Sequence, residues 1–234
     1  MDIYNLIIET TRKCNMMCWH CLRGEPQNKN IPVKYIDHLF RNIWNGNISV
    51  LTITGGEPSM NVKSIRSIIY FAKIYRVIIE NFYIATNGLK ATKNFINAIR
   101  ELYDYCDDNE ISQVHWSNDN YHHHDDGVIS RLSELEFAGP KFDKDRVTYP
   151  VLRQGRAEVH GEKEVSAPDI EFNEEGIQEG EIYLNCNGNI INGCNWSYKS
   201  QNRKEHIICK VENFSLRAIE EYCLIYQKED DNKN

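Results

Sequence analysis

Three closely spaced cysteines near the start of the chain are the residues whose chemistry is easiest to interpret. Cys14, Cys18 and Cys21 are separated by three and then two residues, and they follow an apolar-rich run at residues 3–8. A loop this tight can turn three thiolates toward one centre, and thiolates are the soft ligands that iron-sulfur clusters take. Loops in electron carriers normally supply four cysteines. Three would leave one iron open to a substrate or cofactor, so the spacing indicates chemistry rather than storage of charge.

A zinc knuckle is the alternative interpretation of these cysteines, with His20 or a distant residue as the fourth ligand. His20 is adjacent to Cys21, and neighbouring side chains rarely close together on one small ion. A zinc ribbon would usually also show a second CxxC pair. The zinc interpretation therefore fits the sequence poorly.

A second motif supports the cluster. Gly55, Gly56, Glu57 and Pro58 follow a β-rich run at residues 49–54. This order predicts an exposed glycine turn at the carboxyl end of a buried strand.

Strand-like and helix-like segments alternate along the chain, which is typical of βα units around a parallel sheet or barrel. The expected strands are residues 3–8, 49–54, 82–86, 111–116 and 147–152. Four amphipathic helices are expected from apolar residues at helical spacing. These residues are Ile36, Leu39, Phe40 and Ile43; Ile65, Ile68, Ile69 and Ala72; Phe95, Ile99 and Leu102; and Val128, Leu132 and Leu135. Gly139-Pro140 is expected to interrupt the regular secondary structure after the fourth helix.

The C-terminal part has a different pattern. Residues 158–180 are charged and punctuated by glycine, which indicates a loop, lid or linker. Asn187-Gly188 separates two apolar stretches and predicts a hairpin with a tight turn. Ser215 is expected to cap a closing helix. The organisation expected is a core at 1–157, a loop, hairpin and helix at 158–227, and a disordered tail at 228–234.

CNMMCWHC and ITGGEP together resemble the motifs of the radical S-adenosylmethionine superfamily. The resemblance covers residues 3–157 and is specific at these two motifs. It implies a partial (β/α)6 TIM-type barrel, here with a short C-terminal hairpin and helix. By the same resemblance, Cys14, Cys18 and Cys21 hold a 4Fe-4S cluster whose open iron binds S-adenosylmethionine. Reductive cleavage then yields a 5′-deoxyadenosyl radical, which takes hydrogen from the substrate.

Other site residues follow from the resemblance or from their place at the ends of strands, where ligand contacts gather in barrels. His20 occupies the position near the adenine, and a polar loop residue without a cofactor contact is the alternative. The turn that ends at Pro58 would contact the methionyl amino group of the cofactor through Gly55, Gly56 and Glu57. The remaining candidate cofactor contacts are Thr86, Asn87, Ser117, Asp119 and Arg156. An Asx turn is the alternative for Asp119, and a solvated side chain is the alternative for Arg156.

Histidines and further cysteines raise the question of additional metal sites. His122, His123 and His124 point in divergent directions in any loop, so a solvated loop is expected, with one of them able to reach substrate or to act as an acid or base. Cys106 and Cys223 fall on apolar stripes and are expected to be core thiols. Cys186 and Cys194 flank a hairpin that resembles the auxiliary-cluster extension of peptide-modifying relatives, and Cys209 follows on an expected strand. The CxxC pairs of that extension are missing, so a hairpin without a cluster is the alternative.

Composition restricts the partners and the compartment. The chain has 234 residues, a formal charge of −7 and no blocks of basic residues, which disfavours nucleic acid. It lacks a signal peptide and any apolar run long enough for a membrane, so a cytoplasmic location is expected. The hairpin favours a peptide or protein substrate. The resemblance to the radical S-adenosylmethionine superfamily implies a flavodoxin or ferredoxin as electron donor. Two alternatives remain open: an activating enzyme that installs a glycyl radical on a partner protein, and a non-catalytic iron-sulfur or zinc module.

Overall fold

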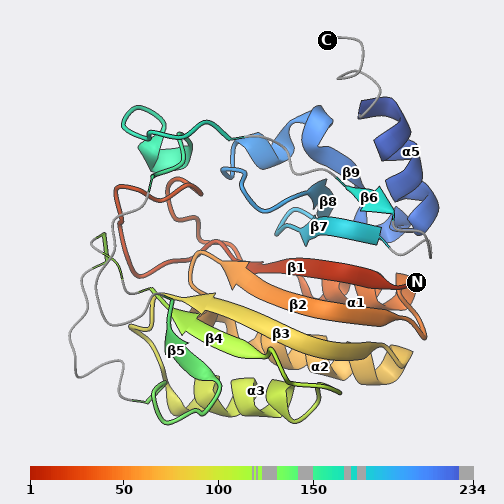
Figure 1. The fold of residues 1–234 in the computed structure, drawn as a ribbon, viewed down its shortest axis with the longest axis horizontal. Helices are drawn as coiled ribbons and strands as arrows, with labels where there is room; N and C mark the ends of the chain where they lie inside the picture. Colours follow the sequence, from red (N-terminus) through yellow and green to blue (C-terminus); the bar gives the residue numbers. More distant parts are fainter. Residues whose placement is uncertain are drawn as a thin grey trace.

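The computed structural model describes residues 1–117, 119, 121–122, 131–141, 150–165, 170–172 and 178–226. Within these residues the strands form one mostly parallel sheet in the order β5-β4-β3-β2-β1-β7-β8-β9, and the short β6 pairs with β7. Three helices, α1 to α3, lie along one face of the sheet (Figure 1). Strands β5 and β9 are its two edges, so the sheet is an open, partial barrel.

The elements have the following bounds. The strands are β1 (Ile3–Thr11), β2 (Asn47–Gly55), β3 (Ile78–Thr86), β4 (Gln113–Trp116), β5 (Ala138–Pro140), β6 (Glu171–Phe172), β7 (Gln178–Leu184), β8 (Asn189–Asn192) and β9 (Ile207–Lys210). The α-helices are α1 (Val33–Asn42), α2 (Val62–Tyr75), α3 (Lys93–Tyr103) and α5 (Leu216–Tyr226). Short 3₁₀ turns are η1 (Pro58–Asn61), η2 (Gly155–Ala157), η3 (Ser200–Asn202), η4 (Lys204–His206) and η5 (Val211–Asn213).

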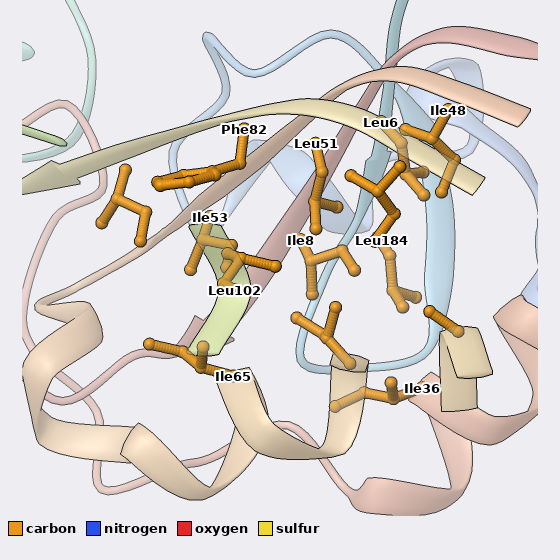
Figure 2. Packing of buried hydrophobic residues seen from close by; sticks show 14 of the residues in the cluster. Leu6, Ile8, Ile36, Ile48, Leu51, Ile53, Ile65, Phe82, Leu102 and Leu184 are labelled. Atoms are coloured by element: carbon orange, nitrogen blue, oxygen red, sulfur yellow. The ribbon is translucent and has the colours of Figure 1, made fainter. Parts of the chain in front are cut away.

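The main core lies between the sheet and helices α1 to α3. Strand side chains such as Leu6, Ile8 and Leu51 point toward helix side chains such as Ile36 and Ile65, and all five are fully buried (Figure 2). Burying one such side chain stabilises the fold by about 1.5–3 kcal/mol. The apolar spacing of the first three expected helices is thus confirmed as the packing face of α1, α2 and α3.

The C-terminal hairpin continues the main sheet. Strand β7 pairs in parallel with β1 and antiparallel with β8, which confirms the hairpin. Its turn is closed by the Gly188 N–H, which donates to the Asn185 carbonyl at 3.0 Å, and Gly188 has a φ of +76°. Glycine adopts this left-handed conformation at little cost. The Ser215 hydroxyl accepts from the Ala218 N–H at 3.2 Å, which confirms the cap of α5.

Three expectations about the middle of the chain are wrong or fall outside the described residues. Gly139-Pro140 does not break the sheet but belongs to β5, which pairs in parallel with β4. Leu132 and Leu135 are buried, but they lie in turns instead of a helix, and Val128 is outside the described residues. Residues 150–152 of the expected fifth strand form only an isolated bridge, between Leu152 and Lys163, while 147–149 are outside the described residues. The expected tail at 228–234 is also outside them.

Among the described helices, none combines the length and the apolarity that crossing a bilayer requires.

Candidate active site

The cysteine loop leaves the carboxyl end of β1 beside the carboxyl ends of β2 and β3 (Figure 1). Together these elements line a cavity of about 440 Å³, called here the cluster cavity. Its walls include eleven of the thirteen predicted site residues: Cys14, Cys18, His20, Cys21, Gly55, Gly56, Glu57, Thr86, Asn87, Ser117 and Arg156. Pro58 and Asp119 are not in its walls. The end of a parallel sheet is where α/β folds place their ligands, so the location suits a cofactor.

The two glycines of the second motif hold the start of the cysteine loop. The Gly56 N–H donates to the Thr11 carbonyl at 2.7 Å, and the Glu57 N–H donates to the Lys13 carbonyl at 2.8 Å. A Cβ on Gly56 would lie 2.2 Å from the Lys13 carbonyl oxygen, and one on Gly55 would lie 2.3 Å from that of Thr11. Only glycine permits so close an approach of two backbones. The motif is therefore needed to position the thiols.

A third glycine holds the far end of the same loop. The Arg156 N–H donates to the Cys21 carbonyl at 3.0 Å. Gly155 has a φ of +61°, and a Cβ on it would lie 2.3 Å from the Leu22 carbonyl oxygen. The turn η2 thus fixes the position of the third cysteine just as the Gly-Gly turn fixes that of the first.

The three thiols are half-buried and free of disulfides. Burial raises the pKa of Cys18 to about 11, and the neighbouring thiols Cys14 and Cys21 add to the rise, whereas the Arg156 guanidinium opposes it. Burial likewise raises the pKa of Cys14. A metal group binds thiolates and not thiols, so a cationic centre here would displace the thiol protons and relieve the repulsion among the three negative charges. The donor set therefore fits a metal group.

Within the described residues, Cys14, Cys18 and Cys21 do not form a set with the spacing of a single-ion site.

One set of side chains does have the spacing of a single-ion site: Cys18, His20 and His122 each offer a ligand atom within 4.8 Å of the others. The sequence did not predict this set, because His122, His123 and His124 were expected in a solvated loop, from which one of them could reach substrate. The structure places His122 in the wall of the cluster cavity. His123 and His124 lie outside the described residues.

Glu57 connects the second motif to strand β3. Its carboxylate is buried and accepts from the Thr86 hydroxyl and the Asn87 N–H, both at 2.7 Å, and from the Ser59 N–H at 3.0 Å. The Asn87 amide in turn donates to the Asn15 side chain at 2.9 Å. Thr86 and Asn87 therefore join β3 to the cysteine loop through Glu57.

His20 belongs to an aromatic cluster at the edge of the cavity. Its ring centroid lies 4.8 Å from that of Tyr121 and 4.7 Å from that of His122. Burial and the neighbouring His122 lower the pKa of His20 to about 4, so the ring is neutral near pH 7. Its Nδ1 atom is buried and lacks a hydrogen-bond partner among the described residues. A neutral ring with an unused polar atom can stack on a base or donate to it.

Asp119 positions His122. The buried carboxylate accepts from the Tyr121 and His122 N–H groups at 2.8 and 2.9 Å, as in an Asx turn, and lies 2.8 Å from His122 Nδ1. Burial raises the pKa of Asp119, but the His122 side chain and these N–H donors outweigh it and lower the pKa overall. The structure therefore places Asp119 behind His122, and His122 at the cavity.

A buried polar cluster behind the cysteine loop was not predicted from the sequence. Glu9, at the end of β1, pairs with the Arg12 guanidinium at 2.6 Å, and both side chains are almost wholly buried. The Tyr183 hydroxyl and the Gln201 amide donate to Glu9 at 2.9 and 3.0 Å, and Arg12 donates to the Gln201 oxygen at 2.7 Å. The signal in the sequence was the alternation along β1, which puts Glu9 on the same face as Ile7. This cluster joins β1 to the C-terminal residues.

The remaining cysteines do not assemble into a second metal site within the described residues. Cys186 is buried, and its thiol donates to the Glu9 carbonyl at 3.2 Å. Burial raises the pKa of Cys194 and of Cys209 to about 12. Cys106 is a buried core residue and Cys223 packs at the edge of the core, as expected.

Comparison with known proteins identifies the class. The family model of the Radical SAM superfamily matches residues 8–124, half of the chain. The chain therefore belongs to the Radical SAM superfamily and is a radical SAM enzyme. Membership implies S-adenosylmethionine and an iron-sulfur cluster as cofactors. A search of curated proteins found no match.

Solved structures agree with this fold. The anSMEcpe structure with bound AdoMet aligns with a TM-score of 0.59 at 9% identity, covering 94% of this chain and 80% of that one. The structure of anSMEcpe with bound AdoMet and the Cp18Cys peptide has the same TM-score and the same coverage of both chains, at 10% identity. BtrN in an open conformation aligns with a TM-score of 0.53 at 13% identity, covering 96% of this chain and 84% of that one. At these identities the likeness concerns the fold alone.

Proposed function

We propose that this enzyme cleaves S-adenosylmethionine reductively at a 4Fe-4S cluster held by Cys14, Cys18 and Cys21, and that it abstracts hydrogen from a peptide or protein. The observation that carries the proposal is that the three thiols and the Gly55-Gly56-Glu57 turn line one cavity. When bound, the cluster supplies the electron that converts S-adenosylmethionine to methionine and a 5′-deoxyadenosyl radical. A flavodoxin or ferredoxin is the proposed source of that electron.

The chain's own residues bind and orient the cofactor. A carboxylate has about four acceptor sites, and three of those on Glu57 are used by Thr86, Asn87 and Ser59. One site is left for the methionyl amino group, together with the backbone carbonyls of Gly55 and Gly56. Ser117 and Arg156 line the same cavity and suit the ribose and the carboxylate of the cofactor.

The aromatic cluster suits the adenine. His20 is neutral near pH 7 and offers the face of its ring beside Tyr121. His122, positioned by Asp119, closes the same side of the cavity. These aromatic side chains thereby shield the reacting centre from water, which is the protein's main task in radical chemistry.

Two observations support a peptide or protein as substrate. The hairpin β7–β8 resembles in sequence the extension of peptide-modifying relatives, and it packs directly against β1. In addition, a structure that shares this fold contains both AdoMet and a peptide. An auxiliary cluster is not part of the proposal, since Cys186 is engaged with the Glu9 carbonyl.

Anaerobic reconstitution tests the proposal. We expect about four irons per chain and, after addition of dithionite and S-adenosylmethionine, release of 5′-deoxyadenosine. Cys18→Ser should lose both, whereas Cys223→Ser, which changes another partly buried cysteine, should keep both. Binding of one zinc ion that is lost in His122→Ala would instead support a single-ion site at Cys18, His20 and His122 and contradict the proposal.

A further inference from the structure

A second cavity of about 640 Å³ lies next to the cluster cavity and is not used by the proposed cofactors. It is bounded by residues 23–27 after the cysteine loop, by residues 153–158 around η2, and by residues 196–203 after β8. Arg23 and Arg156 line both cavities. We call this second cavity the polar chamber, and a molecule in it would be separated from the cluster cavity only by the shared walls.

The walls of the polar chamber carry an excess of positive charge. The cations are Arg23, Arg153, Arg156, Lys199 and Arg203, and the carboxylates are Glu25, Glu158 and Glu164. This excess stands out in a chain with a formal charge of −7. Clefts lined by one sign of charge concentrate ligands of the opposite sign.

Among the described residues, several of these cations lack a close carboxylate. Arg153 pairs with Glu164 at 3.0 Å, but Lys199 and Arg203 form no ion pair within the described residues. Among the described residues, the carboxylate that pairs with Arg156 is a distant one, Glu25 at 4.0 Å. The Arg156 Nη1 donates to the Met17 sulfur at 3.4 Å, but its buried Nε atom has no hydrogen-bond partner among these residues. A buried donor that is left unused costs free energy unless a ligand accepts from it.

We propose that the polar chamber binds an acidic segment of the peptide substrate, with its carboxylates on Lys199 and Arg203 and the adjoining residue directed past Arg156 into the cluster cavity. The inference rests on the proposed function and adds the substrate class. A nucleic acid fits less well, because Glu25, Glu158 and Glu164 interrupt the cations and would repel a continuous row of phosphates. A peptide with a few acidic side chains meets the same walls without that penalty.

Fluorescence anisotropy of the reconstituted 234-residue protein tests the inference, with a fluorescein-labelled glutamate-rich peptide as the probe and its glutamine counterpart as reference. We expect tighter binding of the glutamate peptide, weakened by salt. Lys199→Ala combined with Arg203→Ala should weaken it about tenfold, because each exposed ion pair contributes up to a factor of about five. Lys63→Ala combined with Arg100→Ala removes two exposed cations from α2 and α3 and should leave binding within about twofold.

The outcomes separate this inference from the proposed function. Equal affinity for the two peptides, or an unchanged affinity in the Lys199 and Arg203 double variant, would overturn the polar chamber as an acidic-peptide site. Tighter binding of a labelled oligothymidylate than of the glutamate peptide would overturn it in favour of nucleic acid. Release of 5′-deoxyadenosine without peptide should persist in the double variant, since neither residue lines the cluster cavity. If that release is absent in the wild type while peptide binding is as expected, the proposed function fails and the polar chamber stands.

Discussion

Replacing Gly56 by alanine tests whether the Gly-Gly turn sets the position of the cysteine loop. The added Cβ would lie 2.2 Å from the Lys13 carbonyl oxygen and would have to move away by about 1.2 Å to reach an ordinary contact of 3.4 Å. That movement would break the hydrogen bond that the Glu57 N–H donates to the Lys13 carbonyl, and it would strain the one that the Gly56 N–H donates to the Thr11 carbonyl. Overpacking costs about 1–3 kcal/mol and each lost hydrogen bond about 1 kcal/mol, so the free energy of unfolding should fall by about 3 kcal/mol.

The assay compares this variant with Gly139→Ala, whose Cβ would meet nothing within 4 Å. For a domain of this size, a loss of 3 kcal/mol lowers Tm by about 6–12 °C. Gly56→Ala should show this shift and, after anaerobic reconstitution, a reduced iron content, because Lys13 directly precedes Cys14. Gly139→Ala should match the wild type in both measurements. If Gly56→Ala kept the Tm and the iron content of the wild type, the idea that the Gly-Gly turn positions the cysteine loop would be refuted.

Three further predictions concern Glu9, the cysteines of the C-terminal part and the turn of the hairpin. Burial raises the pKa of Glu9, but Arg12 and the other donors around the carboxylate outweigh it and lower the pKa overall, so this carboxylate stabilises the fold above about pH 4.5 and loses that effect as the pH falls. Glu9→Gln should lower the free energy of unfolding, measured by urea titration, by about 3 kcal/mol at pH 7, and this difference from the wild type should narrow in acid. A difference that stays constant with pH would contradict the assignment. Cys186→Ala combined with Cys194→Ala should keep about four irons per chain, whereas a drop of several irons would show a second cluster. Gly188 has a φ of +76°, and a Cβ on it would lie within 3 Å of the Tyr35 ring. Gly188→Ala should therefore lower Tm without changing the iron content. An unchanged Tm would show that the hairpin turn does not require glycine.

The sequence was informative where one local pattern determines the structure. Helices α1 to α3 were predictable because their apolar residues recur at the spacing of one helix face. The hairpin was predictable because Asn187-Gly188 supplies the turn residue that the backbone requires. The cysteine and glycine motifs were found because they are short and contiguous, and because together they resemble the motifs of one family.

Features that depend on distant neighbours were missed. Pro140 lacks an N–H and therefore suggested a break, yet an edge strand such as β5 tolerates proline on its outer side. The apolar Val151 is buried at 4% exposure without belonging to a strand, so hydrophobicity alone was misleading there. The pairing of Asp119 with His122 and the cluster around Glu9 depend on loop geometry and on partners up to 192 residues away.

The pairing of β1 with β7 has a consequence for the order of events in the cell. During synthesis the three cysteines leave the ribosome early, but Tyr183 and Gln201, which hold the end of β1, emerge much later. At about 5–20 residues per second, the delay between Cys21 and Gln201 is about 9–36 s. Throughout that interval the end of β1 lacks these two partners, so we expect productive loading of the proposed cluster to follow, rather than accompany, translation of the N-terminal half.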